Sequence, residues 1–476
     1  MPARLLLLAA VVLTAAPAAA QPTVEPVGGK LPVTLTLYPA VPLKPLSRLT
    51  LLPEYRDMVQ GNAVQGFLRA FMEQDTLYAG VAQNKRAEVA QLPLTHPDVL
   101  AGDLSGYVER HVADAARMTT ADWQLFHLIR QDGYGTLLPD VQKMRALATV
   151  LQVTARSQIA AGKPADAART VQILFALART LEAHPTLIGH LVGVAIGTIG
   201  CNVLEELVQT PGCPNLFWAL ADLPTPFLSL RLPAQGERIM FGTYFGLLAG
   251  PAPLSEAELT RAIGKIEVGL AVIREGRVGT EESAADLARV RYALWSVDPG
   301  RVAAARDRLA RSGVAPALAR DMLPLQAVVA DDCRRAETAF DDFTKWQNLP
   351  AHQAMPAMRA AKKALPDPAA DGVLVMYSPL SLIKVKSAQA RLDQRLAYLQ
   401  VVEALRLDAA EGTGVTPPES LAELKLPVPL DPVTGKPFVY SVTDRVATLT
   451  GGDPSGEPGN GVTNRVYTIR MIGGRR

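Results

Sequence analysis

Residues 185–209 read PTLIGHLVGVAIGTIGCNVLEELVQ, the most apolar internal stretch of the chain. Gly189, Gly193 and Gly197 recur every four residues, so a helix would carry all three on one face. Glycine costs about 1 kcal/mol relative to alanine inside a helix, so three on one face indicate that a neighbouring backbone approaches closely. The stretch therefore predicts a helix around which other helices pack.

Such a helix has two interpretations, a membrane span with a small-residue contact face or a buried helix of a soluble body. His190 and Asn202 interrupt the apolar run, and Glu205 follows it. The uninterrupted apolar part is shorter than the roughly 20 residues that a bilayer requires. We favour the buried helix and expect no membrane span in the mature protein.

The first 20 residues resemble a secretory signal peptide. Arg4 supplies a basic start, residues 5–13 are apolar, and three alanines at 18–20 offer a cleavage site. We therefore expect an exported protein, periplasmic or extracellular. Removal of residues 1–20 would lower the formal net charge of the chain from +2 to +1, because Arg4 is the only charged residue among them. A near-neutral chain gives no reason to expect nucleic acid or an anionic membrane surface as a partner.

The remaining chain divides by pattern. Residues 21–52 form an extended segment in which 31–37, LPVTLTL, alternates like a short strand, and residues 53–350 are expected to be all helical. Within them, 139–161 and 164–183 predict a helical hairpin, since Gly162 ends one helix and Pro164 opens the next. The hairpin, ARSQIAAGKPADAARTVQILFALARTL, resembles one tetratricopeptide repeat. The whole layout resembles bacterial secreted helical proteins of unknown function.

Three cysteines, Cys201, Cys213 and Cys333, have two interpretations. In an oxidising compartment, Cys201 and Cys213 could form a disulfide if the chain doubles back between them. Alternatively, all three are small buried apolar side chains, and this is the interpretation we favour.

Beyond residue 350 the character changes. Residues 351–378 are basic and broken by proline, which indicates a linker. Residues 379–476 predict a long helix to about residue 410, followed by strands at 438–442, 446–450 and 466–471. The predicted fold class is mainly α, a helical-hairpin array followed by a small module of one helix and an antiparallel sheet.

The module carries a resemblance. Its helix ends in VVEALRLDAAEG, then come TPPESLAEL and VPLDPVTGKPFVYSV. This order is similar to the globular part of type II secretion pseudopilins, whose turn and loop positions are held here by Asp431, Pro432, Gly435, Pro437 and Phe438. The resemblance implies that these residues are structural. The acidic calcium-binding loop of that family has no counterpart here, so it implies no metal ligand.

The sequence contains none of three common motifs for catalysis, zinc binding or phosphate binding. The chain lacks G-x-S-x-G, H-E-x-x-H and the phosphate-binding G-x-x-x-x-G-K, and we expect no cofactor or metal. Titratable and aromatic residues crowd together only at Glu109, His111, Asp122, Trp123 and His127, which are the candidates for lining a pocket.

Two pairs of aspartates, at 331/332 and 341/342 on a predicted helix from 324 to about 346, are candidate metal ligands. Asp331 lies four residues before Arg335, and Asp341 four before Lys345, so ion pairs along one helix would satisfy them. We expect a solvated face there rather than a metal site.

The leading hypothesis is an exported, non-enzymatic helical scaffold that binds a protein partner. One alternative is an envelope hydrolase or carbohydrate-active enzyme. Another is an accessory component of a type II secretion or pilus-like system.

Overall fold

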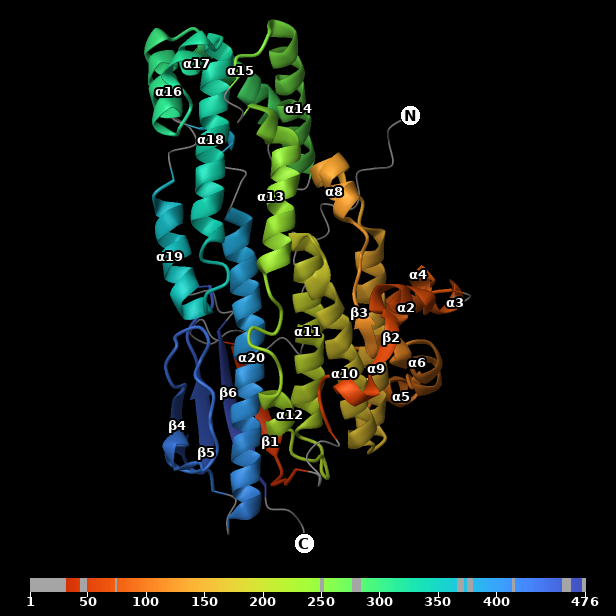
Figure 1. Ribbon diagram of the computed structural model, residues 1–476. Helices are drawn as coiled ribbons and strands as arrows, with labels where there is room; N and C mark the ends of the chain where they lie inside the picture. Colours follow the sequence, from red (N-terminus) through yellow and green to blue (C-terminus); the bar gives the residue numbers. More distant parts are fainter. Residues whose placement is uncertain are drawn as a thin grey trace.

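The computed structural model describes residues 31–42, 49–72, 75–248, 252–275, 284–365, 372–374, 380–412, 416–455 and 464–472. The molecule is elongated and mainly helical, with a four-stranded sheet at one end (Figure 1). The predicted class, a helical array with a small helix-and-sheet module, is confirmed. The expected signal peptide at 1–20 lies outside the described residues.

Three long helices form the centre of the molecule: α9 (Pro139–Ala160), α10 (Pro164–Thr180) and α11 (Leu187–Leu207). Both α9 and α10 begin with proline, whose fixed φ suits the first helical position. Gly162 between them has φ +71°, a conformation that suits glycine. The predicted hairpin is thus present, and α11 packs against both of its helices.

The glycines of α11 meet neighbours closely. A Cβ atom would lie 2.2 Å from the His184 ring at Gly189 and 2.8 Å from Leu392 at Gly197. At Gly193 the neighbours include the carbonyl oxygen of Ala178 in α10, at 3.2 Å. The predicted close packing is therefore present, although only Gly193 of the three has a backbone atom among its nearest neighbours.

The helix α11 is long and apolar enough to cross a bilayer, and 67% of its most apolar window is buried inside the protein. It packs on α9, α10, α13 (Arg231–Phe245) and α20 (Leu380–Glu411). Thr186 caps its start by accepting a hydrogen bond from the Gly189 amide, at 3.1 Å. This is the central packing position that the apolar run predicted.

Short elements lie on the outer side of α9 and α10, and α8 (Phe126–Asp132), which follows them, packs on α13. They are β2 (Val59–Asn62), α2 (Ala63–Arg69), α3 (Asp75–Tyr78), α4 (Gly80–Val89), α5 (Pro97–Leu100), α6 (Ser105–His111), α7 (Ala113–Ala116) and β3 (Met118–Thr120). Strands β2 and β3 pair in parallel, so the expectation that residues 53–350 are all helical was wrong there. Strands this short carry too little alternation to be recognised from sequence.

The far end of the molecule is a separate group of helices, here called the head. It comprises α14 (Glu256–Glu275), α15 (Ala284–Ser296), α16 (Pro299–Arg311), α17 (Pro316–Asp321) and the first part of α18 (Pro324–Thr344). Of these helices, α14, α15, α16 and α18 share an apolar core with the end of α13, and α17 packs in a smaller cluster with α16 and α18. In Figure 1 the head lies at the end opposite the sheet. The short α12 (Phe217–Ala221) packs on α20.

The predicted linker at 351–378 contains α19 (Ala351–Lys363), so that boundary was wrong. Its buried face consists of Ala351, Ala354, Met355 and Met358. This apolar face stabilises the helix even though it contains Pro356, a residue that predicts a break in a helix.

The C-terminal sheet contains β4 (Val439–Thr443), β5 (Val446–Thr450) and β6 (Arg465–Met471), close to the predicted strands. Its order is β1-β6-β5-β4, where β1 is Leu31–Leu37. The strand β1 pairs in parallel with β6, so the N-terminal segment is part of the C-terminal module rather than a separate region. Short 3₁₀ turns complete the fold at Tyr55–Asp57, Gly133–Gly135, Leu181–Ala183, Gly246–Leu248 and Leu421–Glu423.

Replacing Gly193 tests the central packing. We expect Gly193→Leu to lower the free energy of unfolding by about 1–3 kcal/mol, because the new side chain has no space between α10 and α11. Gly264→Leu in α14 is the control, since no atom lies within 4 Å of its Cβ position. Chemical denaturation measures both, and equal effects would contradict the assigned packing.

Candidate functional site

The five sequence candidates have different surroundings. Trp123 is buried, and its indole N–H donates to the carbonyl oxygen of Thr180 at 3.0 Å. Its ring also meets the His184 ring edge-on, with centroids 4.7 Å apart. Trp123 therefore anchors the loop after β3 to the central helices, which is a structural role.

The other four candidates are exposed. Glu109 and His111 lie on α6, where the His111 ring packs on Tyr107. Asp122 accepts a hydrogen bond from the Gln124 amide at 3.0 Å, and His127 lies on α8. The structure does not gather the five into one pocket. Their density in the sequence reflects short consecutive elements whose side chains point in different directions.

All three cysteines are free, buried thiols, so the disulfide alternative is not formed. Burial raises the pKa of Cys201 and of Cys213 to about 12, which leaves both as uncharged thiols. They lie by different ion pairs: Cys201 near Glu205 and Arg395, Cys213 near Glu403 and Arg406. The chain does not double back between them, and they serve as small buried side chains.

The Asp431 loop is a structural junction, as the resemblance implied for these residues. One carboxylate oxygen of Asp431 accepts from the Val433 amide at 3.0 Å and from Gln394 of α20 at 2.9 Å. The other accepts from Thr434 at 2.9 Å and from the Gly452 amide at 2.8 Å. Four donors occupy the carboxylate, so its hydrogen-bonding capacity is used within the protein.

The remaining residues of this loop complete the junction. Pro432 accepts a hydrogen bond from the His352 amide of α19 at 3.2 Å, and Gly435 adopts φ +67° beside the His352 ring. Pro437 precedes Phe438, whose ring lies 4.6 Å from that of Tyr398 in α20. The loop therefore joins α19, α20 and the sheet.

Two buried histidines stay uncharged near neutral pH. Burial lowers the pKa of His184 to about 3, and burial with nearby Lys386 lowers that of His190 to about 4. Within the described residues, neither ring nitrogen of His190 has a hydrogen-bond partner. Both rings are enclosed in the core, which separates them from any substrate in solution.

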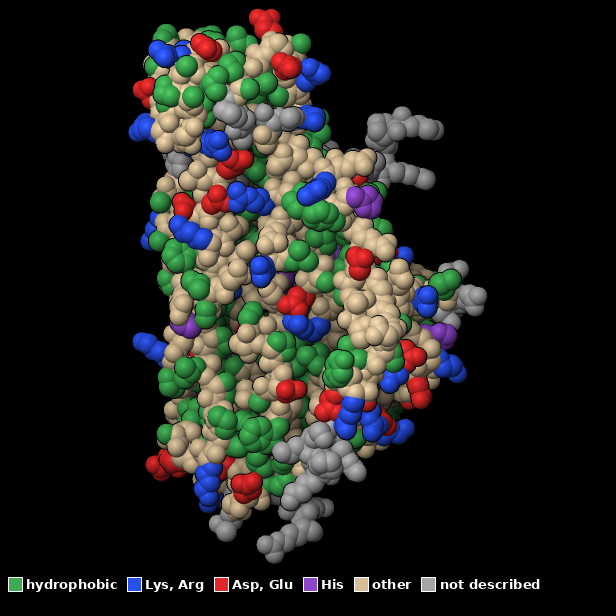
Figure 2. Space-filling view, viewed as in Figure 1, with side chains coloured by type: hydrophobic (Ala, Val, Ile, Leu, Met, Phe, Trp, Pro, Cys, Tyr) green, Lys and Arg blue, Asp and Glu red, His purple; other side chains and the backbone are tan. Residues whose placement is uncertain are grey.

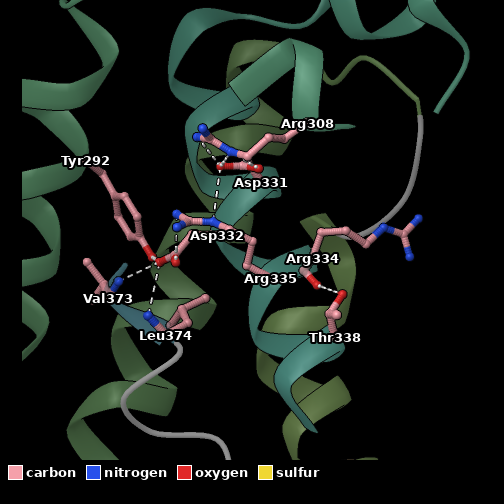
Figure 3. A network of polar contacts seen from close by, with 9 residues as sticks. All are labelled: Tyr292, Arg308, Asp331, Asp332, Arg334, Arg335, Thr338, Val373 and Leu374. Atoms are coloured by element: carbon pink, nitrogen blue, oxygen red, sulfur yellow. Dashed lines mark hydrogen bonds and ion pairs between the residues drawn. The ribbon is translucent and has the colours of Figure 1, made fainter. Parts of the chain in front are cut away.

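The most concentrated polar arrangement lies in the head, where α15, α16 and α18 meet (Figure 3). Asp331 forms ion pairs with Arg308 at 2.7 Å and with Arg335 at 3.3 Å. The predicted pairing of Asp331 with Arg335 is confirmed. The predicted solvated face is wrong at Asp331 and Asp332, whose side chains are buried, and confirmed at Asp341 and Asp342, whose side chains are about half exposed.

The neighbouring Asp332 points inward and is fully buried. One of its oxygens accepts three hydrogen bonds, from Tyr292 at 2.7 Å, the Val373 amide at 2.9 Å and the Leu374 amide at 3.0 Å (Figure 3). Burial raises the pKa of Asp332, and these donors together with Arg335 oppose that effect. Asp332 thus fixes the segment between α19 and α20 onto the head.

The predicted ion pair between Asp341 and Lys345 is not formed. Asp341 pairs with Arg238 of α13, while Lys345 pairs with Asp342 at 2.6 Å. Spacing along one helix could not reveal the partners on α13 and α16. Among the described residues, no group of three or more His, Cys, Asp or Glu side chains could hold a metal ion.

A groove of about 680 Å³ lies directly beside this network. Its wall comprises Trp295, Asp298, Gly300, Arg301, Ala304, Ala305, Arg308, Val328, Asp331, Arg335 and Ala364. No motif or spacing in the sequence predicts this groove. The sequence feature that could have indicated this groove is the high number of arginines in α15 and α16. These arginines follow no periodic pattern, and they line a groove only because α18 packs beside them.

Removing Asp332 tests the network. We expect Asp332→Ala to lower the free energy of unfolding by about 3–5 kcal/mol, because it leaves Tyr292 and two amides buried without an acceptor. Asp342→Ala is the control, since its exposed pair with Lys345 contributes about 0–1 kcal/mol. Chemical denaturation measures the free energy of unfolding of both variants. If Asp332→Ala lowers that free energy no more than Asp342→Ala does, the assigned role is contradicted.

No protein-family model, curated protein or solved structure matches this chain. The geometry and chemistry of the described residues are therefore the basis for proposing a function.

Proposed function

We propose that the protein is an exported, non-enzymatic scaffold that binds a partner protein through its head. The observation that carries this proposal is an apolar stripe on α15. Val290, Leu294 and Val297 are 56%, 62% and 77% exposed. Val290 and Leu294 are four residues apart and share one side of α15, and Val297 follows directly after the end of that helix. The opposite side of α15, with Ala288 and Tyr292, packs into the head core.

An exposed apolar stripe costs free energy in water, and covering it by a partner would recover that cost. Figure 2 shows hydrophobic side chains among charged ones at the surface of the head, at the top of the view. The complementary partner is therefore a protein whose contact surface is apolar at its centre.

The shape supports a scaffold. The head and the sheet lie at opposite ends of the elongated molecule, connected by long helices (Figure 1). A partner bound at the head is thereby held at a distance from whatever contacts the sheet. Export remains part of the proposal, supported by the signal-like residues 1–20.

Disrupting the stripe tests this function. In affinity capture from a cell-envelope extract, we expect Val290→Asp/Leu294→Glu to recover about tenfold less of the partner protein than the wild type, because charge replaces the apolar contact. Val81→Asp/Leu137→Glu is the matched control, since those positions are 84% and 56% exposed elsewhere on the surface. Equal recovery by both double variants would contradict the proposal.

A second candidate is an accessory role in a type II secretion or pilus-like system. The packing of α20 against the sheet supports it, because the pseudopilin resemblance implies a long helix on a small sheet with antiparallel strands, as β4, β5 and β6 are here. Deleting the gene should then reduce the amount of secreted protein in the culture medium. Unchanged secretion would contradict this candidate.

A further inference from the structure

The C-terminal sheet has two edges, and they differ in how far their backbone groups are occupied. In the strand order β1-β6-β5-β4, the edge strands are β1 and β4. An edge strand presents a row of backbone N–H and C=O groups that can pair with a strand of another chain. The occupancy of these groups therefore shows which edge is open to such pairing.

The edge at β1 is protected within the chain. The amide of Leu31 donates to the residue before β6 at 2.7 Å, so alternate residues from Leu31 onward bond to β6. The residues that face outward are then Pro32, Thr34 and Thr36. Pro32 has no N–H, and Thr36 donates its amide hydrogen to the side chain of Gln209 at 3.0 Å. Few donors of β1 are left for another strand.

The edge at β4 lacks this protection. Asp444 and Arg445, both with positive φ, form a two-residue turn between β4 and β5. Residues that flank such a turn exchange both backbone hydrogen bonds, so Thr443 bonds to β5. By alternation, the N–H and C=O groups of Tyr440 and Val442 point away from β5. Within the part of the chain that the structure describes, these groups have no hydrogen-bond partner.

The sequence of β4, VYSVT, also has none of the usual features that prevent pairing at an edge. It contains no charged residue and no proline, and its register with β5 is continuous, without a bulge. Valine, tyrosine and threonine favour strands. Every residue of β4 is exposed or partly exposed, and Val439 is 70% exposed. Figure 1 shows β4 on the outer side of β5, away from β6.

A second copy of the same strand fits this edge. If two β4 strands run antiparallel around a twofold axis at Ser441, Tyr440 of each chain lies opposite Val442 of the other. The outward N–H and C=O groups of both residues are then paired. An aromatic side chain beside a β-branched one is a favourable cross-strand pair. Ser441 meets its own copy at the axis, where neither side chain carries a charge.

We propose that two copies of this chain form a dimer by antiparallel pairing of their β4 strands, which joins the two sheets into one. A twofold contact uses the same surface on both chains, so the assembly closes at the dimer. The head lies at the end opposite the sheet, so the apolar stripe of both chains stays uncovered (Figure 1). This inference goes beyond the scaffold function, because it concerns association of the chain with itself through the sheet.

Sedimentation velocity of the full mature chain, over a series of micromolar concentrations, tests the inference. We expect a monomer–dimer equilibrium with Kd on the order of 10 µM, because one short strand from each chain makes the contact. Ser441→Lys should raise this Kd about tenfold or more, since it places like charges opposite each other at the axis, and Ser441→Glu should do the same. An equimolar mixture of the two variants should recover the dimer, because opposite charges then meet.

Thr34→Lys is the matched control, since Thr34 is an exposed residue at the centre of the other edge strand, and this change should leave Kd unchanged. Thermal melts establish that each variant is folded, and Ser441→Glu gives an independent reading if Ser441→Lys is not.

The inference is overturned if the wild type stays monomeric, which is the result expected if an extended segment of another protein occupies the edge. It is also overturned if assemblies larger than a dimer form, if Ser441→Lys weakens the dimer no more than Thr34→Lys does, or if the mixture does not recover it. Capture of a protein partner through the stripe is measured separately, so either proposal can fail alone.

Discussion

The structure depends on one buried carboxylate, that of Glu205 on α11. Arg395 of α20 donates to it at 2.7 Å and Tyr467 of β6 at 2.5 Å, while Arg465 lies 3.4 Å away. Burial raises the pKa of Glu205, but the two arginines and Tyr467 outweigh that effect, and the net shift is downward. A buried charge is tolerated only when paired and hydrogen-bonded, so the three elements must meet in one geometry. This requirement fixes the sheet against the central helix.

The helix α20 extends that constraint along the molecule. Its side chains belong to four apolar clusters: Leu392 to the core around α9–α11, Tyr398 to the sheet core, Leu382 to a cluster with α18 and α19, and Ala390 to a small cluster with α19. At the other end, Asp332 holds the segment before α20 onto the head. Buried polar groups such as Glu205 and Asp332 thus join separate elements of the fold. The proposed scaffold function would depend on these connections, because they keep the head and the sheet at a fixed separation.

Local patterns predicted the helical hairpin, the central helix and the three C-terminal strands, because periodicity, caps and turn residues act over a few positions. They did not predict the pairing of β1 with β6 or the contact between Arg238 and Asp341, because such partners are set by packing between distant segments. Pro356 predicted a break in the chain, but burial of the apolar face of α19 stabilises a helix that contains this proline. The groove could not be predicted for the same reason as the pairing of β1 with β6, because its wall comes from four elements and no single stretch of sequence contains it.

The most direct test of the central claim is hydrogen–deuterium exchange, followed by mass spectrometry, on the Glu205→Ala variant. The account predicts that amide protection falls together in α11, α20 and β6, because the variant leaves Arg395 buried without its counter-charge, at a cost of about 3–5 kcal/mol. Asp140→Ala, which removes an exposed pair with Lys143, should leave protection unchanged. Loss of protection confined to α11, with the sheet as protected as in the wild type, would contradict the claim that Glu205 joins the helical body to the sheet.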